Sequence, residues 1–313
     1  MALLSLLIFL QPFGEYAAVW EQARLWPVML AYGLTVPMVL LRAWQAACLA
    51  RLQRISVGFG SLVGLQLATT FYGLFAPGIV AAGMLRWYRL ARLSGETGAT
   101  LALVVFSRML EIEIALLLGL CFWLADSAAP GAPALPMAFA GLFLVLFMAR
   151  YAAFHPQVAA VISGLVSRWW PVGRLARLRA HLLDLLAVTG RYGTLTGPAW
   201  ATLLLNILAG HMLGLLSVGL IALAVGMDVG WATLGWARAV LALALLLPIT
   251  WAGIGLREAT LAVALVAAGQ PAAAAVTMGL LLSLRVLIEA CAGGLGELHA
   301  WLANALQEKR LSS

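Results

Sequence analysis

The sequence predicts an all-α integral membrane protein, a polytopic helical bundle, from three observations. Of its 313 residues, 64% are hydrophobic and only 10% are charged, whereas soluble domains contain about 25% charged residues. Several apolar stretches reach about 20 residues, enough for a helix to cross a hydrocarbon core of about 30 Å. Lipid offers no partner to backbone N–H and C=O groups, so these stretches must satisfy their own hydrogen bonds as helices.

The basic residues predict the orientation of the chain. The formal net charge is +7, and the arginines stand between apolar runs, where basic residues favour the cytoplasmic side and meet anionic lipid headgroups. We therefore expect a multi-pass protein of the bacterial cytoplasmic (inner) membrane, with a cytoplasmic C-terminus and no nucleic-acid partner. The predicted cytoplasmic segments hold Arg51 and Arg54, then Arg86, Arg89 and Arg92, then the stretch from Arg150 to Arg191, and finally Lys309 and Arg310.

Two of the predicted helices are interrupted by Pro and Gly. Pro77-Gly78 breaks the first, and Pro248, followed by Gly253 and Gly255, breaks the second. Pro removes a backbone donor and Gly loosens a helix, so each is a plausible reversal point at membrane depth. The alternative is that both are ordinary kinks in crossing helices. Apolar windows place the helices at about 1–13, 26–50, 58–92 (broken), 99–125, 134–154, 198–226, 233–269 (broken) and 272–304.

The positive-inside rule predicts that the two broken segments are re-entrant helical hairpins. It places both ends of 58–92 inside and both ends of 233–269 outside, so neither segment crosses. Residues 1–313 then form a single membrane domain with an inverted repeat, and paired discontinuous segments are typical of a transporter's substrate site. The predicted parts are a first repeat at 26–125, a linking helix and interfacial amphipathic segment at 126–197, and a second, inverted repeat at 198–304.

The linking part contains an Arg-rich and Trp-rich stretch, residues 155–192. Aromatic and cationic residues interleaved with Leu favour an amphipathic segment at the cytoplasmic interface. It could gate or recruit anionic lipid, or it could be a passive anchor between two bundles.

Charged residues inside apolar helices are the first candidates for the substrate-binding site, since a charge at the bilayer centre costs about 2.5 to 3.5 kcal/mol on insertion scales. Arg108 and Glu111 are three residues apart, and Arg285 and Glu289 are four apart, so each pair shares a helix face and is expected to pair locally. The pairs either only neutralise each other or also line the substrate path. Glu113 points away from Glu111 and has no evident partner.

The segment PITWAGIGLREATLA, residues 248–262, is the sharpest local signal. Gly253 and Gly255 allow a close approach of the backbone, and a helix that begins near Arg257 presents its positive end and a guanidinium to an anion. Glu258 favours the helix dipole and could instead neutralise Arg257. Arg86 is the counterpart after the first break, or else a plain positive-inside arginine.

The remaining polar residues give no strong indication of a substrate site. Arg42 is expected to snorkel to the cytoplasmic surface, and Asn206, His211 and His299 are expected to form interhelical hydrogen bonds. No catalytic nucleophile motif, metal-ligand spacing or cofactor motif occurs, and the chain has a single lysine, Lys309, so we expect neither ATPase activity nor a metal site. The cysteines, at 48, 121 and 291, show no disulfide pattern.

Several motifs resemble the flippase-like transmembrane domain shared with lysylphosphatidylglycerol synthetases. They are LLRAWQ at 40–45, the APG…RWYRL stretch at 76–90, FSRMLE at 106–111, the stretch from Pro248 to Ala259, and LLLSLRVLIE at 280–289. The resemblance implies an all-helical inner-membrane protein that moves or delivers a lipid such as an aminoacylated phospholipid, a hopanoid or a polyprenyl-linked glycan.

Two departures from the family pattern limit what the resemblance implies. Synthetases of the family carry a soluble aminoacyl-transfer domain after this region, so we expect no lipid aminoacylation from residues 1–313 alone. Many relatives also have an acidic residue soon after the first Pro-Gly, whereas 79–85 contains none here. A carboxylate role in the first hairpin is therefore not carried over to this chain.

The sequence thus predicts a lipid translocase that moves an anionic or lipid-linked headgroup by alternating access, with no ATPase or transferase domain. The alternative is a non-transporting accessory protein that binds lipid or scaffolds a separate lipid-modifying enzyme. A third possibility is an intramembrane lipid transferase that uses Glu111, Glu258 or Glu289 as a base, although no nucleophile is evident. The expected partners are a membrane phospholipid, a polyprenyl-linked lipid or a hopanoid, with a lipid-modifying enzyme possible.

Overall fold

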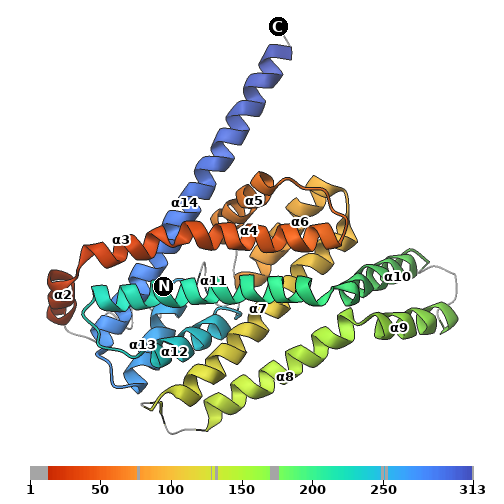
Figure 1. Ribbon diagram of the computed structural model, residues 1–313. Helices are drawn as coiled ribbons and strands as arrows, with labels where there is room; N and C mark the ends of the chain where they lie inside the picture. Colours follow the sequence, from red (N-terminus) through yellow and green to blue (C-terminus); the bar gives the residue numbers. More distant parts are fainter. Residues whose placement is uncertain are drawn as a thin grey trace.

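In the part of the chain that the computed structural model describes, all regular secondary structure is helical (Figure 1). The described residues are 13–75, 78–127, 129–130, 133–169, 176–247, 250 and 253–311. The predicted first helix at 1–13 and the break points Pro77 and Pro248 therefore lie almost wholly outside the described residues. The all-α membrane fold is confirmed.

The first half of the chain forms a long helical stretch (Leu25–Leu52), a helical hairpin and a second long helix (Thr97–Ala125). The hairpin consists of α5 and α6, which pack against each other, and α5 has only 15 residues. A short amphipathic helix, α2, precedes them and was not predicted. The helices are α2 (Phe13–Gln22), α3 (Leu25–Gly33), α4 (Thr35–Leu52), α5 (Phe59–Gly73), α6 (Gly78–Ser94) and α7 (Thr97–Ala125).

The second half repeats this order. Here α12 and α13, of 14 and 12 residues, pack against each other between two long helices. At 1.5 Å per residue α12 and α13 each span about 20 Å, less than a hydrocarbon core of about 30 Å. The helices are α11 (Gly197–Ala224), α12 (Trp231–Ala244), α13 (Leu256–Ala267) and α14 (Ala272–Leu311).

Between the halves lie one long helix and two shorter ones, visible on one side of the bundle in Figure 1. They are α8 (Ala134–Phe154), α9 (Pro156–Trp169) and α10 (Ala176–Gly190), followed by a 3-10 turn, η1 (Arg191–Thr194). On α9, Val161 and Leu165 are exposed, whereas Tyr192 of η1 is buried and stacks on Phe106 of α7 with 4.1 Å between ring centroids. The end of the linking segment is thus part of the bundle core, and the interfacial placement of α9 stays a prediction.

Each hairpin packs against the last helix of the other half. α5 lies against α14 and α12 lies against α7, while α4 lies against α11. Glycines permit both close contacts: a Cβ on Gly293 would overlap the Leu67 carbonyl of α5, and one on Gly119 would lie 2.5 Å from the Cβ of Ala239 on α12. Such reciprocal packing is what two halves related by two-fold pseudosymmetry would produce. The repeat itself, its boundaries and the re-entrant placement of the hairpins stay predictions.

Four helical stretches among the described residues are long and apolar enough to cross a membrane. They are Leu25–Leu52, Ala134–Phe154, Gly197–Ala224 and Ala272–Ala303. Large apolar side chains such as Met137 and Val145 of α8, which are 70% and 64% exposed, cover the outside of the bundle. An apolar exterior of this extent fits lipid rather than water, so the chain is a multi-pass membrane protein.

Candidate functional site

A cavity of about 340 Å³ lies between the two halves, and its wall is unusually rich in arginine. It is bordered by residues of both hairpins and of the long helices α4, α7, α11 and α14. The charged and polar side chains that line it are Arg42, Gln45, Thr70, Arg108, Glu111, Asn206, His211, Arg238, Arg257, Arg285 and Glu289. Five arginines thus face two carboxylates.

The start of α13 is shaped by its two glycines. Gly253 and Gly255 have φ of +75° and +85°, a region that side chains with a Cβ rarely adopt. Gly255 is the N-cap residue, and its backbone N–H donates to the Glu258 carboxylate at 2.7 Å, which occupies the usual capping position three residues later. This turn fixes the beginning of α13 so that Arg257 reaches the cavity. The lining of the cavity does not include Gly253, Gly255 or Glu258. These residues instead position Arg257 from outside the cavity.

Arg257 and Glu258 are joined through a serine that the sequence did not suggest. Arg257 Nη1 donates to Ser283 Oγ of α14 at 2.9 Å, and Ser283 Oγ donates to Glu258 Oε1 at 2.6 Å. Both charged residues are buried, with 8% and 0% exposure. Gly279 makes room for this contact, because a Cβ there would lie 2.7 Å from Glu258 Cα. Glu258 therefore neutralises Arg257 in the buried wall, the alternative noted from the sequence.

Arg285 and Glu289 do not form the predicted local pair, and that prediction is wrong. Arg285 Nη1 instead donates to Ser217 Oγ of α11 at 3.1 Å, and Glu289 accepts a hydrogen bond of 2.9 Å from Thr70 Oγ1 of α5. Each side chain is drawn to a neighbouring helix, because hydrogen-bonding groups of α11 and α5 lie closer than the next turn of α14. Both residues still line the cavity.

Arg108 and Glu111 form the predicted pair, and both line the cavity. Arg108 Nη1 lies 3.3 Å from Glu111 Oε2, and the two side chains are 39% and 24% exposed. The cavity is thus open enough at α7 to leave this ion pair accessible.

Arg238 is the clearest residue that sequence reasoning missed. Its Nη1 lies 3.1 Å from His211 Nδ1, and His211 Nε2 lies 3.2 Å from the Glu111 carbonyl oxygen. Because a guanidinium only donates, Nδ1 accepts and the hydrogen on Nε2 is donated to the carbonyl. His211 is thus the interhelical hydrogen-bonder that was predicted. Gly214 leaves space for the Arg238 guanidinium, which a Cβ there would overlap.

The structure places Arg42 and Arg86 differently from the sequence prediction. Arg42 lines the cavity and is exposed at the same time, and no ion pair joins it to another described residue. Arg86 does not line the cavity, although it lies close enough to Arg42 and Arg108 to interact with them electrostatically. Arg42 therefore belongs to the cavity wall, whereas Arg86 lies near that wall without being part of it.

Hydrogen-bond donors around the cavity lack acceptors. Among the described residues, Gln45 Nε2, Asn206 Nδ2, Arg108 Nε and Arg285 Nε are buried without a hydrogen-bond partner, and all four residues line the cavity. Buried donors without acceptors are costly. A ligand rich in negatively charged oxygen would satisfy them.

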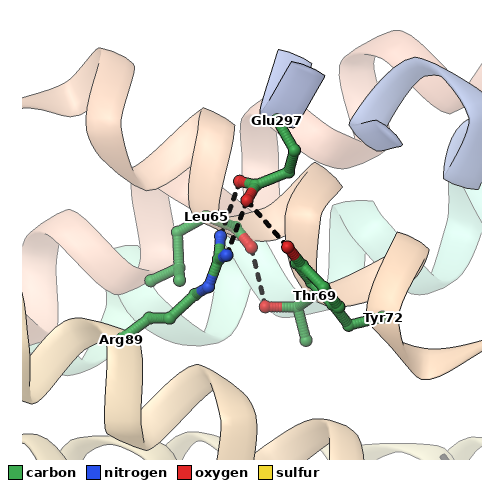
Figure 2. Close-up of polar contacts among 5 residues, drawn as sticks. All are labelled: Leu65, Thr69, Tyr72, Arg89 and Glu297. Carbon is green, nitrogen blue, oxygen red and sulfur yellow. Dashed lines mark hydrogen bonds and ion pairs between the residues drawn. The ribbon is translucent and has the colours of Figure 1, made fainter. Parts of the chain in front are cut away.

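Two arginines outside the cavity form ion pairs with glutamates. Arg150 Nε contacts both carboxylate oxygens of Glu113, at 2.7 and 3.0 Å, which identifies the missing partner of Glu113. Figure 2 shows Arg89 of α6 and Tyr72 of α5 pointing at Glu297 of α14: the guanidinium donates twice at 2.6 Å and the hydroxyl donates at 3.0 Å. These pairs tie helices together outside the cavity.

Of the residues predicted to bind substrate, the structure gathers Arg108, Glu111, Arg257, Arg285 and Glu289 around one cavity. Arg238 could have been found, because any ionisable residue in an apolar helix is a functional candidate. Thr70 and Ser217 carried no signal, since isolated hydroxyl residues are common in membrane helices. The described residues contain no group of three or more His, Cys, Asp or Glu side chains that could hold a metal ion.

A family model described as the lysylphosphatidylglycerol synthase TM region matches residues 1–292. This confirms the resemblance that the motifs indicated, and the matched range includes every residue of the cavity wall. Neither a curated protein nor a solved structure matches the chain.

Proposed function

Because the chain belongs to the lysylphosphatidylglycerol synthase TM-region family, a family of membrane proteins in lipid modification or transport, we propose that it is a lipid translocase. It moves a lipid with an anionic headgroup across the cytoplasmic membrane. The observation that carries the proposal is the cavity between the two halves, with its five arginines and its buried donors that lack acceptors.

The charges in the cavity favour an anionic occupant. Arg257 is balanced by Glu258 and Arg108 by Glu111, which leaves Arg42, Arg238 and Arg285 facing Glu289. Unbalanced charge within a membrane is expensive, and phosphate oxygens fit guanidinium groups in bidentate geometry. An anionic headgroup in the cavity therefore lowers the cost of placing these guanidinium groups within the membrane.

The helical hairpins supply a route for movement. We expect one half to rock against the other at the reciprocal contacts, where α5 lies on α14 and α12 lies on α7. Such rocking about a fixed site exposes it to each side of the membrane in turn, as in transporters built from repeats. The headgroup rests on the arginines while its acyl chains remain in lipid.

A reconstitution experiment tests the proposal. Purified protein is placed in liposomes that contain phosphatidylglycerol with a fluorescent headgroup-proximal label, and an impermeant quencher reports which leaflet the label occupies. Wild-type protein should move the label between leaflets. Arg285→Gln should slow movement about tenfold or more, because one charge-assisted hydrogen bond to the headgroup is lost.

The matched control is Arg51→Gln, which changes an exposed arginine at the end of α4. It should move lipid at the wild-type rate. If the wild-type protein retains anionic lipid during purification but never equilibrates the leaflets, the chain is a lipid-binding accessory protein and the translocase proposal fails. Equal rates for Arg285→Gln and wild type would also contradict it.

The orientation that we propose, with the C-terminus on the cytoplasmic side, has its own test. Single cysteines introduced at the loop residues Glu96 and Gln270, in a chain whose native cysteines are replaced, should react with an impermeant thiol reagent from opposite sides of the membrane. Labelling of both from one side would contradict the inverted topology.

A further inference from the structure

We propose that the cavity selects lipids whose phosphate group carries two negative charges, a phosphomonoester or a diphosphate, over phosphodiester lipids with one. This inference rests on the proposed function, because it concerns the headgroup held in the same cavity, and it names the class of that headgroup.

The charge of the cavity wall is the first argument. With Arg257 and Arg108 balanced by their own carboxylates, three guanidinium groups remain: those of Arg42, Arg238 and Arg285. Glu289, which is 9% exposed and held by Thr70, is the carboxylate set against them among the described lining residues. Two positive charges are therefore left over, and a dianionic phosphate compensates both where a phosphodiester compensates one.

Arg86 adds to this excess. It lies outside the lining but interacts electrostatically with Glu111, Arg42 and Arg108. Since Glu111 is already engaged by Arg108 at 3.3 Å, Arg86 increases the positive potential at the α4 and α7 side of the cavity. The field there favours the more highly charged of two headgroups.

The number of donors is the second argument. Four buried N–H groups without partners surround the cavity, from Gln45, Asn206, Arg108 and Arg285. Arg42 adds a guanidinium that bonds to no described residue. A phosphomonoester presents three terminal oxygens with a charge of about −1.5 to −2 near neutral pH, whereas a phosphodiester presents two terminal oxygens that share one charge. The monoester can therefore satisfy more of these donors.

The experiment measures binding, so that it does not depend on transport. Full-length protein in detergent is titrated with phosphatidic acid, phosphatidylglycerol and phosphatidylcholine of identical acyl chains, and bound lipid is counted by native mass spectrometry. Phosphatidic acid should bind about tenfold or more tightly than phosphatidylglycerol, the ratio expected for one additional charge-assisted hydrogen bond. Phosphatidylcholine should bind weakest.

Charge variants identify the source of the preference. Arg42→Gln removes one excess positive charge and should weaken phosphatidic acid binding more than phosphatidylglycerol binding, which brings their ratio close to one. Arg51→Gln, on the same helix but outside the cavity, should leave the ratio unchanged. A wild-type protein that binds phosphatidylglycerol as tightly as phosphatidic acid, or an Arg42→Gln variant that keeps the full preference, would overturn the inference.

Different results would refute the headgroup selectivity and the translocase function. Equal binding of both lipids with intact leaflet exchange of phosphatidylglycerol overturns only the headgroup selectivity. Glycerol 3-phosphate, which lacks acyl chains, separates a lipid from a free phosphate ester. If it displaces phosphatidic acid at equal concentration, the dianion preference stands while the lipid assignment, and with it the translocase, fails.

Discussion

Two groups of arginines among the described residues lie in different surroundings. Between the helices, Arg150 and Arg89 each meet a carboxylate with two short contacts. In the cavity, Arg42, Arg238 and Arg285 meet only neutral groups or no described partner. Paired arginines hold helices together, whereas a membrane protein keeps unpaired ones at a cost that binding of an anion recovers. On our proposal, the paired arginines are structural and the unpaired cavity arginines bind the headgroup.

Breaking the most buried structural pair should have the largest effect on stability. The side chains of Arg150 and Glu113 are 13% and 3% exposed, so Glu113→Leu leaves a guanidinium without its counter-charge. We expect a loss of about 3 to 5 kcal/mol in unfolding free energy, measured by denaturation in detergent.

The double variant Glu113→Leu/Arg150→Met sharpens this test. It removes both charges, and should recover most of the lost stability because no charge is left buried alone. If Glu113→Leu is as stable as wild type, the pair is not structural and the distinction between the two groups of arginines does not hold.

The next largest loss of stability is expected when the close contact of α14 with α5 is disturbed. Gly293→Ala places a methyl group against the Leu67 carbonyl and should cost about 1 to 3 kcal/mol, as overpacking does. Gly296→Ala, three residues later with nothing within 4 Å of its added Cβ, should be neutral or slightly stabilising. Melting curves of the two variants that coincide would refute the packing described for these helices.

The smallest effect is expected at the cluster in Figure 2. The side chains of Arg89 and Glu297 are 28% and 29% exposed, so solvent and salt screen their attraction. Arg89→Gln should lower stability by about 1 kcal/mol or less. The difference from wild type should shrink as salt is raised from low concentration to 1 M. Arg89 Cζ also lies 4.6 Å from the centre of the Tyr72 ring, and a salt-independent loss would show that this contact, not charge, dominates.

Apolar length and Pro/Gly punctuation predicted the helices from α3 to α8 and from α11 to α14, but not α9 and α10 as separate helices. Stretches such as 134–154 and 272–304 match α8 and α14 closely at their beginnings, because length and hydropathy alone dictate a membrane helix. The unpredicted α2 is amphipathic and short, so neither signal reveals it. The rule for local charge pairs succeeded at Arg108 but failed at Arg285, where Ser217 of another helix is the partner.

The site was only partly predictable for the same reason. Local motifs identified Arg257 and Glu258, because both lie in the first turn of α13. There the Glu258 carboxylate accepts a hydrogen bond from the backbone N–H of Gly255. Arg42 and Arg238 become site residues only through the packing of α4, α11 and α12 around one cavity, and Ser283 acquires its role only because Gly279 brings α14 against α13. Contacts between helices far apart in sequence carry no local signal.

The central claim is that unpaired cavity arginines hold a lipid phosphate. The most direct test is an experimental structure of the protein in nanodiscs that contain phosphatidic acid. We predict headgroup density within hydrogen-bond distance, about 3 Å, of the Arg238 or Arg285 guanidinium, and loss of that density in Arg238→Gln/Arg285→Gln. A cavity without lipid, with phosphate density only at the outer surface of the bundle, would contradict the account.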